Sequence, residues 1–179
     1  MSSKSISVRR LILAAMFLAL AMVLPFLTGQ IPQIGRALSP MHIPALLCGF
    51  FCGPWYGLAV GFIAPLLRFA LFGMPPILPK GLAMCFELAT YGCVSGLMYR
   101  ILPKKKINVY VALITAMIAG RIIWGIASAI IYGFGDSEFG WSAFIAGGIV
   151  GSAPGIILQI ILIPVLVITL EKYTANSGN

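Results

Sequence analysis

Long apolar stretches, separated by short polar or proline-rich connections, dominate the chain. Five such stretches can be followed: Leu11–Leu27, Met41–Phe72, Ile77–Leu102, Val109–Phe134 and Phe144–Leu170. A helix needs about 20 apolar residues to cross the hydrocarbon core of a bilayer. The second stretch has 32 residues and would be about 48 Å long as one helix, which exceeds the core thickness of about 30 Å. It also contains the break Gly53-Pro54, so the pattern predicts either one or two helices there.

The positions of the basic residues favour two helices in that stretch. Lys4, Arg9 and Arg10 precede the first stretch, and a second cluster between the third and fourth stretches contains Arg100, Lys104, Lys105 and Lys106. Basic residues next to membrane spans favour the cytoplasmic side, which requires an even number of crossings between the two clusters. The sequence therefore predicts an all-α integral membrane protein, a single transmembrane domain over residues 1–179, with both termini inside. Its six transmembrane helices are expected at residues 10–28, 41–53, 55–73, 78–101, 107–133 and 142–171.

Composition agrees with this architecture and excludes several classes of protein. Hydrophobic residues make up 60% of the chain and charged residues 9%, and the mean hydropathy is +1.04. A soluble domain has about 25% charged residues, so a water-soluble enzyme is excluded. The net charge of +8 belongs to residues that lie mainly at the ends of apolar runs, which indicates membrane topology rather than nucleic-acid binding.

The residues that usually carry catalysis or bind cofactors do not form a recognisable pattern. The four cysteines lie in apolar segments and there is one histidine, so no metal site is predicted. The sequence has no nucleotide-binding glycine loop and no serine nucleophile motif. We expect neither a cofactor nor an enzyme.

Ionisable side chains inside the predicted spans mark a candidate binding site, because such groups are costly in lipid. Glu87 and Arg121 are expected about 10 Å and 18 Å below the outer ends of their helices, either as a structural ion pair or in an outward-facing pocket. Tyr91 shares a helix face with Glu87, and Trp124 and Ser128 share one with Arg121. The remaining candidates for substrate binding are Arg68, Lys80, Gln159 and His42.

The candidate residues leave two functions open. Basic residues outnumber the single glutamate, so a pocket would be positive and would suit an anionic group of a small molecule. The alternative is an autonomous proton-coupled carrier or channel that uses Glu87 as its coupling group.

Small residues repeat at every fourth position in three regions. Gly49, Gly53, Gly57 and Gly61 form one series, Gly147, Gly151 and Gly155 form another, and Ala15 and Ala19 form a pair on the first helix. This spacing allows helices to approach closely, either within one bundle or against a second membrane protein. Docking to a second protein fits Ala15 and Ala19 best, because their helix has few polar atoms to turn inward.

The segment from Leu38 to Tyr99 contains the run Pro-Ala-Leu-Leu-Cys-Gly-Phe-Phe-Cys-Gly-Pro. Together with the six predicted helices and the Ala15-x-x-x-Ala19 pair, it forms a recognisable family pattern. It resembles the substrate-binding S component of energy-coupling factor (ECF) vitamin transporters. The resemblance implies a six-helix bundle that binds a water-soluble vitamin near the outer surface, held by the last three helices. Loops 1 and 3 would cover the vitamin, and loop 3 corresponds to Met74–Pro79.

The same resemblance implies partners and a location. The Ala15 and Ala19 surface would meet a transmembrane T component, which two cytoplasmic ATPases drive, in the plasma membrane of a prokaryote. The motif Ser-Pro-Met-His-Ile-Pro around His42 is most similar to the pantothenate-type branch. Carriers of riboflavin, folate and hydroxymethylpyrimidine share the scaffold.

Overall fold

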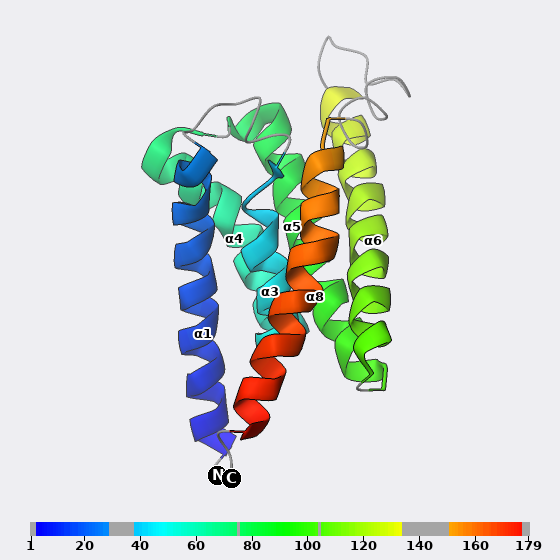
Figure 1. Cartoon of the computed structure of the whole chain (residues 1–179). Coiled ribbons are helices and arrows are strands. Elements are labelled where there is room, and N and C mark those ends of the chain that lie inside the picture. The colour runs from blue at the N-terminus through cyan, green and yellow to red at the C-terminus, as the bar shows by residue number, and fades with distance from the viewer. Residues whose placement is uncertain (1–2, 29–37, 75, 104, 134–150, 177–179) are drawn as a thin grey trace.

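The described residues form a bundle of helices that run roughly along one direction (Figure 1). The computed structural model describes residues 3–28, 38–74, 76–103, 105–133 and 151–176. In chain order the elements are α1 (Ser3–Val23), the 3-10 helix η1 (Leu24–Thr28), α3 (His42–Cys52), α4 (Pro54–Phe72), the π-helical turn η2 (Ile77–Gly81), α5 (Leu82–Ile101), α6 (Lys106–Gly133) and α8 (Ala153–Asn176). Within these ranges no residue is in a strand. In the described part of the chain, five helices are long and apolar enough to cross a membrane and α3 is a shorter apolar helix, which confirms the predicted all-α membrane bundle.

The long second stretch is divided into α3 and α4, as an even number of crossings requires. Gly53 ends α3 with a φ of 99°, a backbone conformation that residues with a side chain rarely adopt. Pro54 opens α4 at the first helical position, where its missing N–H would have had no partner in the helix. Both chain termini lie at the same end of the bundle in Figure 1, which we call the terminal end.

The observed helix ends differ from the predicted ones at three places. α1 begins at Ser3 and gives way to η1 at Leu24, instead of running from residue 10 to residue 28. The helix expected from residue 78 is regular only from Leu82, because Leu78 has extended backbone angles of φ −109° and ψ 136°. For the last predicted helix, residues 142–150 lie outside the described residues, and α8 continues to Asn176.

Close contacts between glycines hold α3 and α4 against α5. Gly57 of α4 and Gly92 of α5 approach so closely that a Cβ atom on either would overlap the backbone of the other. A Cβ atom on Gly49 or Gly61 would likewise overlap the backbone of α5. This stripe of small residues therefore packs inside the bundle, where close backbone approach favours helix association.

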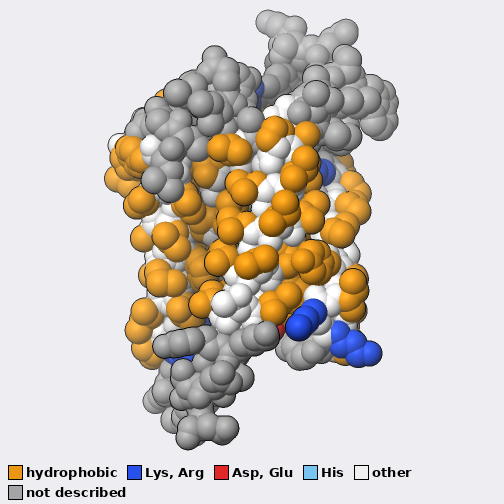
Figure 2. All heavy atoms as spheres, viewed as in Figure 1, with side chains coloured by type: hydrophobic (Ala, Val, Ile, Leu, Met, Phe, Trp, Pro, Cys, Tyr) orange, Lys and Arg blue, Asp and Glu red, His pale blue; other side chains and the backbone are white. Residues whose placement is uncertain are grey.

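The outward faces of the long helices are apolar. Figure 2 shows hydrophobic side chains over the middle of the visible face, with Lys and Arg side chains near the terminal end. On α6, an isoleucine stands exposed at every fourth position: Ile114, Ile118, Ile122, Ile126 and Ile130. Such a surface is typical of a bundle surrounded by lipid, where the helices satisfy the backbone hydrogen bonds.

Candidate functional site

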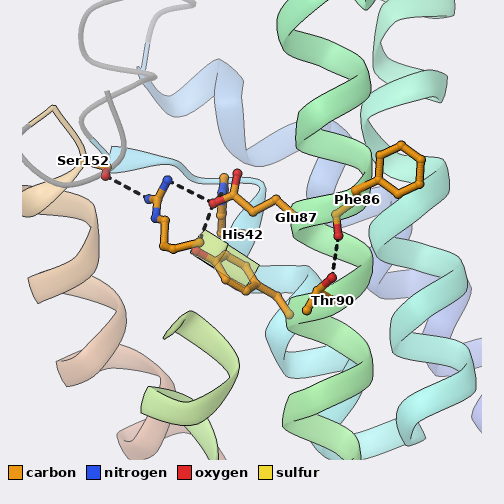
Figure 3. A network of polar contacts seen from close by, with 7 residues as sticks. His42, Phe86, Glu87, Thr90 and Ser152 are labelled. Carbon is orange, nitrogen blue, oxygen red and sulfur yellow. Dashed lines mark hydrogen bonds and ion pairs between the residues drawn. The ribbon is translucent and has the colours of Figure 1, made fainter. Parts of the chain in front are cut away.

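The carboxylate of Glu87 lies at the centre of a buried polar cluster. Glu87 is in the second turn of α5, about 8 Å along the helix from Leu82. Glu87 is only 2% exposed. Its neighbour Phe86 is 43% exposed and points to the opposite side of α5 (Figure 3). One face of α5 therefore meets lipid, while the other carries the polar group into the bundle.

Side chains from three helices converge on Oε1 of Glu87. The Tyr91 hydroxyl, one turn further along α5, donates a hydrogen bond of 3.0 Å. Nη1 of Arg121 on α6 forms an ion pair at 3.0 Å, and Nε2 of His42, the first residue of α3, lies 3.5 Å away. Arg121 also donates from Nη2 to Oγ of Ser152, at 2.8 Å, just before α8 begins (Figure 3). We call these five residues the Glu87 cluster; it joins α3, α5, α6 and the start of α8.

The aromatic member of the cluster is held by close packing. Tyr91 is fully buried, and its ring lies against the backbone of α6 at Gly120, where a Cβ atom would overlap it. The centroid of the His42 ring lies 5.3 Å from that of Tyr91. Gly120 thus gives the tyrosine room to reach Glu87, a positioning role that the sequence analysis missed.

Ser152 is a second residue that the sequence analysis missed. Its carbonyl oxygen accepts a hydrogen bond from the N–H of Ile156 at the start of α8, so it occupies a helix-capping position. A serine two residues before a proline is a recognisable signal for the start of a helix, and Pro154 supplies that proline. The signal identifies the capping position, but not the contact with Arg121.

Three buried polar atoms of the cluster have no hydrogen-bond partner among the described residues. They are Nδ1 and Nε2 of His42 and Nε of Arg121. The 3.5 Å from His42 to Glu87 exceeds the usual length of a hydrogen bond. Buried polar atoms are nearly always paired in folded proteins, so these atoms are suited to contact a bound molecule.

Arg68, another predicted site residue, makes contacts of a different kind. Its Nη1 donates to the carbonyl of Met22 at 2.9 Å, and its guanidinium carbon lies 5.5 Å and 5.3 Å from the ring centroids of Phe26 and Phe72. Met22 belongs to the last turn of α1, whose carbonyls lack partners within the helix. These contacts bind the end of α1 and η1 to α4.

The other predicted site residues are distributed over three elements. Ser128 on α6 and Gln159 on α8 are buried, at 1% and 2% exposure. Trp124 on α6 is partly exposed, and Lys80 in η2 is exposed. The structure thus brings His42, Glu87, Tyr91 and Arg121 together in direct contact, whereas the contacts that Arg68 makes are with Met22, Phe26 and Phe72.

Fold and cluster together define a helical membrane protein with a small polar centre inside an apolar bundle. A family model described as "ECF transporter, substrate-specific component" matches residues 9–167, which is most of the chain, so the chain belongs to this family. Its members are the substrate-specific membrane subunits of transporters that also contain T and ATPase subunits, and they are not enzymes. No curated protein and no solved structure matches the chain. The family match confirms the resemblance seen in the sequence.

Proposed function

We propose that the chain binds a water-soluble vitamin at the Glu87 cluster, from the side of the membrane opposite the terminal end. The observation that carries this proposal is a buried ion pair beside three unpartnered polar atoms within an apolar bundle. Ionisable residues inside a membrane protein usually serve a function, because burying them in lipid is costly. Pantothenate, riboflavin, folate and hydroxymethylpyrimidine are the candidate vitamins.

Each member of the cluster has a proposed role. Arg121 and His42 would donate hydrogen bonds to the vitamin, since they carry the unpartnered atoms. Glu87 and Tyr91 would hold Arg121 in place through the contacts on Oε1. Further along their helices, the candidates for lining the same site are Trp124, Ser128 and Gln159, with Lys80 at its outer edge.

We also propose that α1 docks against the T component in the plasma membrane of a prokaryote. Ala15 and Ala19 are exposed, and so are their apolar neighbours Ile12 and Met16. A small-residue pair on an apolar helix face allows a second helix to approach closely. The cytoplasmic ATPases would then act through the T component.

Binding by the isolated chain tests the first proposal. The protein would be purified in detergent, its extracted small molecules identified by mass spectrometry, and a vitamin panel tested for thermal stabilisation. We expect one vitamin to bind and to lose its affinity in Arg121→Ala. Arg9→Ala, which removes an exposed arginine near the terminal end, is the matched control and should bind normally. Failure of every vitamin to stabilise the protein would contradict the proposal.

Reconstitution separates a subunit from an autonomous carrier. Liposomes that contain only this chain should not accumulate the vitamin, and uptake driven by a proton gradient would instead favour a carrier that uses Glu87. For the docking surface, Ala15→Phe should prevent copurification with the T component while vitamin binding is preserved. Ile118→Phe, on the exposed face of α6, is the control and should copurify. Equal copurification of both variants would contradict docking through α1.

A further inference from the structure

The guanidinium of Arg121 is already paired with a carboxylate of the protein. Glu87 contributes one carboxylate and Arg121 one guanidinium, and the two pair at 3.0 Å. Of the other cationic candidates, Arg68 donates to a backbone carbonyl and lies against two phenylalanine rings, and Lys80 is exposed in η2. The ion pair therefore carries no net charge, and Glu87 already balances the charge of Arg121.

The hydrogen-bonding groups left over define what a ligand must supply. Arg121 offers Nε–H, which is a donor, and His42 offers two ring nitrogens, at least one of which donates. A hydroxyl, an amide or a ring carbonyl has an acceptor oxygen for Arg121 and brings no charge into the bundle. An uncharged polar group therefore satisfies the leftover atoms and keeps the ion pair intact.

A carboxylate in the same position would meet unfavourable electrostatics. It would approach Arg121 from the Nε side while the Glu87 carboxylate already occupies Nη1. Two carboxylates would then share one guanidinium, and like charges at such short range disfavour each other's ionised form. The ligand would also lose the hydration of its charge on entering the apolar bundle.

We infer that the site selects an uncharged hydrogen-bonding group, such as a hydroxyl, carbonyl or amide, and discriminates against a carboxylate at Arg121 and His42. This inference rests on the proposed function and specifies the chemical class of its ligand. Among the candidate vitamins, hydroxymethylpyrimidine and the neutral ring system of riboflavin fit this class. Pantothenate and folate carry carboxylates, so they fit it less well.

Matched ligand pairs that differ in one charge test the inference on the wild-type protein. The probes are pantothenate with pantothenol, nicotinate with nicotinamide, and biotin with its amide, alongside riboflavin and hydroxymethylpyrimidine. A neutral vitamin that binds is paired with the analogue in which a hydroxymethyl group is oxidised to a carboxylate. We expect the neutral member of a pair to bind at least about tenfold more tightly.

The outcomes distinguish this inference from the proposed function. If no probe binds, the proposed function fails, and this inference fails with it. If the carboxylate member binds as tightly as its neutral partner or more tightly, the inference is overturned and vitamin binding stands. A preference for the neutral member supports both.

The glutamate that sets the charge balance provides a second test. Glu87→Gln removes the competing carboxylate, so the affinity ratio within a pair should shift by about tenfold toward the carboxylate member. Glu171→Gln, near the C-terminal end of α8 where Glu171 accepts a hydrogen bond from Tyr99, is the matched control and should leave the ratio unchanged. An unchanged ratio in folded Glu87→Gln would overturn the inference. If this variant does not fold, the wild-type ratio still decides.

Discussion

Replacing Arg121 by methionine would leave the Glu87 carboxylate buried without its cation. The two charges lie 3.0 Å apart, and the Glu87 side chain is 3% exposed. At an effective dielectric constant of about 20, the attraction over this distance is about 5 to 6 kcal/mol, which offsets the cost of removing both charges from water. Loss of one partner from a buried pair costs about 3 to 5 kcal/mol. We expect Arg121→Met and Glu87→Gln each to lower the free energy of unfolding by about that amount.

The double variant shows whether the pairing itself causes this loss. When both members of a buried pair are replaced by neutral residues, the net change is often small, because neither charge is left alone. Glu87→Gln/Arg121→Met should therefore be more stable than either single variant. Unfolding would be followed in detergent micelles by tryptophan fluorescence. The control cycle combines Glu87→Gln with Arg9→Met, an exposed residue near the terminal end, and should be additive. If the losses of the two cluster variants also add, the reasoning is refuted.

Four further substitutions test the packing in and around the cluster. Gly92→Ala places a Cβ atom against the Gly57 backbone and should lower the free energy of unfolding by about 1 to 3 kcal/mol; an unchanged thermal midpoint would contradict the close approach. Gly120→Ala should displace the Tyr91 ring and weaken vitamin binding more than Tyr91→Phe, which removes one hydrogen bond worth about 1 kcal/mol; equal affinities by titration calorimetry would contradict this order. Arg68→Lys keeps the charge but loses the planar contact with two rings, so thermal unfolding should show a loss of about 1 kcal/mol; reduced vitamin affinity with unchanged stability would instead assign Arg68 to the site.

The division of the second stretch into two helices could be predicted because charge and length indicate it independently. A 32-residue apolar stretch is too long for one span, and two basic clusters require an even count. The turn at Gly53 has a backbone conformation that favours glycine, so the break was visible in the sequence. The kink at Leu78 was not visible in the sequence, because an apolar run flanked by prolines does not reveal where regular helix geometry begins.

The cluster was predictable only as far as helix periodicity reaches. Glu87 and Tyr91 are four residues apart, so their contact follows from helix geometry. The pairing of Glu87 with Arg121 was one of two alternatives, since the rotation of α6 against α5 depends on packing that includes Gly120. The contact between Arg68 and Met22 spans 46 residues in sequence, and no local pattern indicates it.

The short length of α3 explains why a histidine near the start of an apolar stretch reaches a buried glutamate. α3 has 11 residues, so His42 lies about 16 Å above the turn at Gly53. The depths of Glu87 and Arg121 can be measured from the end where α5 and α6 are connected. Glu87 lies 14 residues before Ile101, about 21 Å along α5. Arg121 lies 15 residues after Lys106, about 22 Å along α6. Gly53 packs against Gly96 of α5, which lies about 14 Å along the helix from Glu87, so α3 begins with His42 close to the level of Glu87. A second helix long enough to span the bilayer would place its first residue near the membrane surface. The break that divides the second apolar stretch into α3 and α4 therefore also brings His42 to the Glu87 cluster.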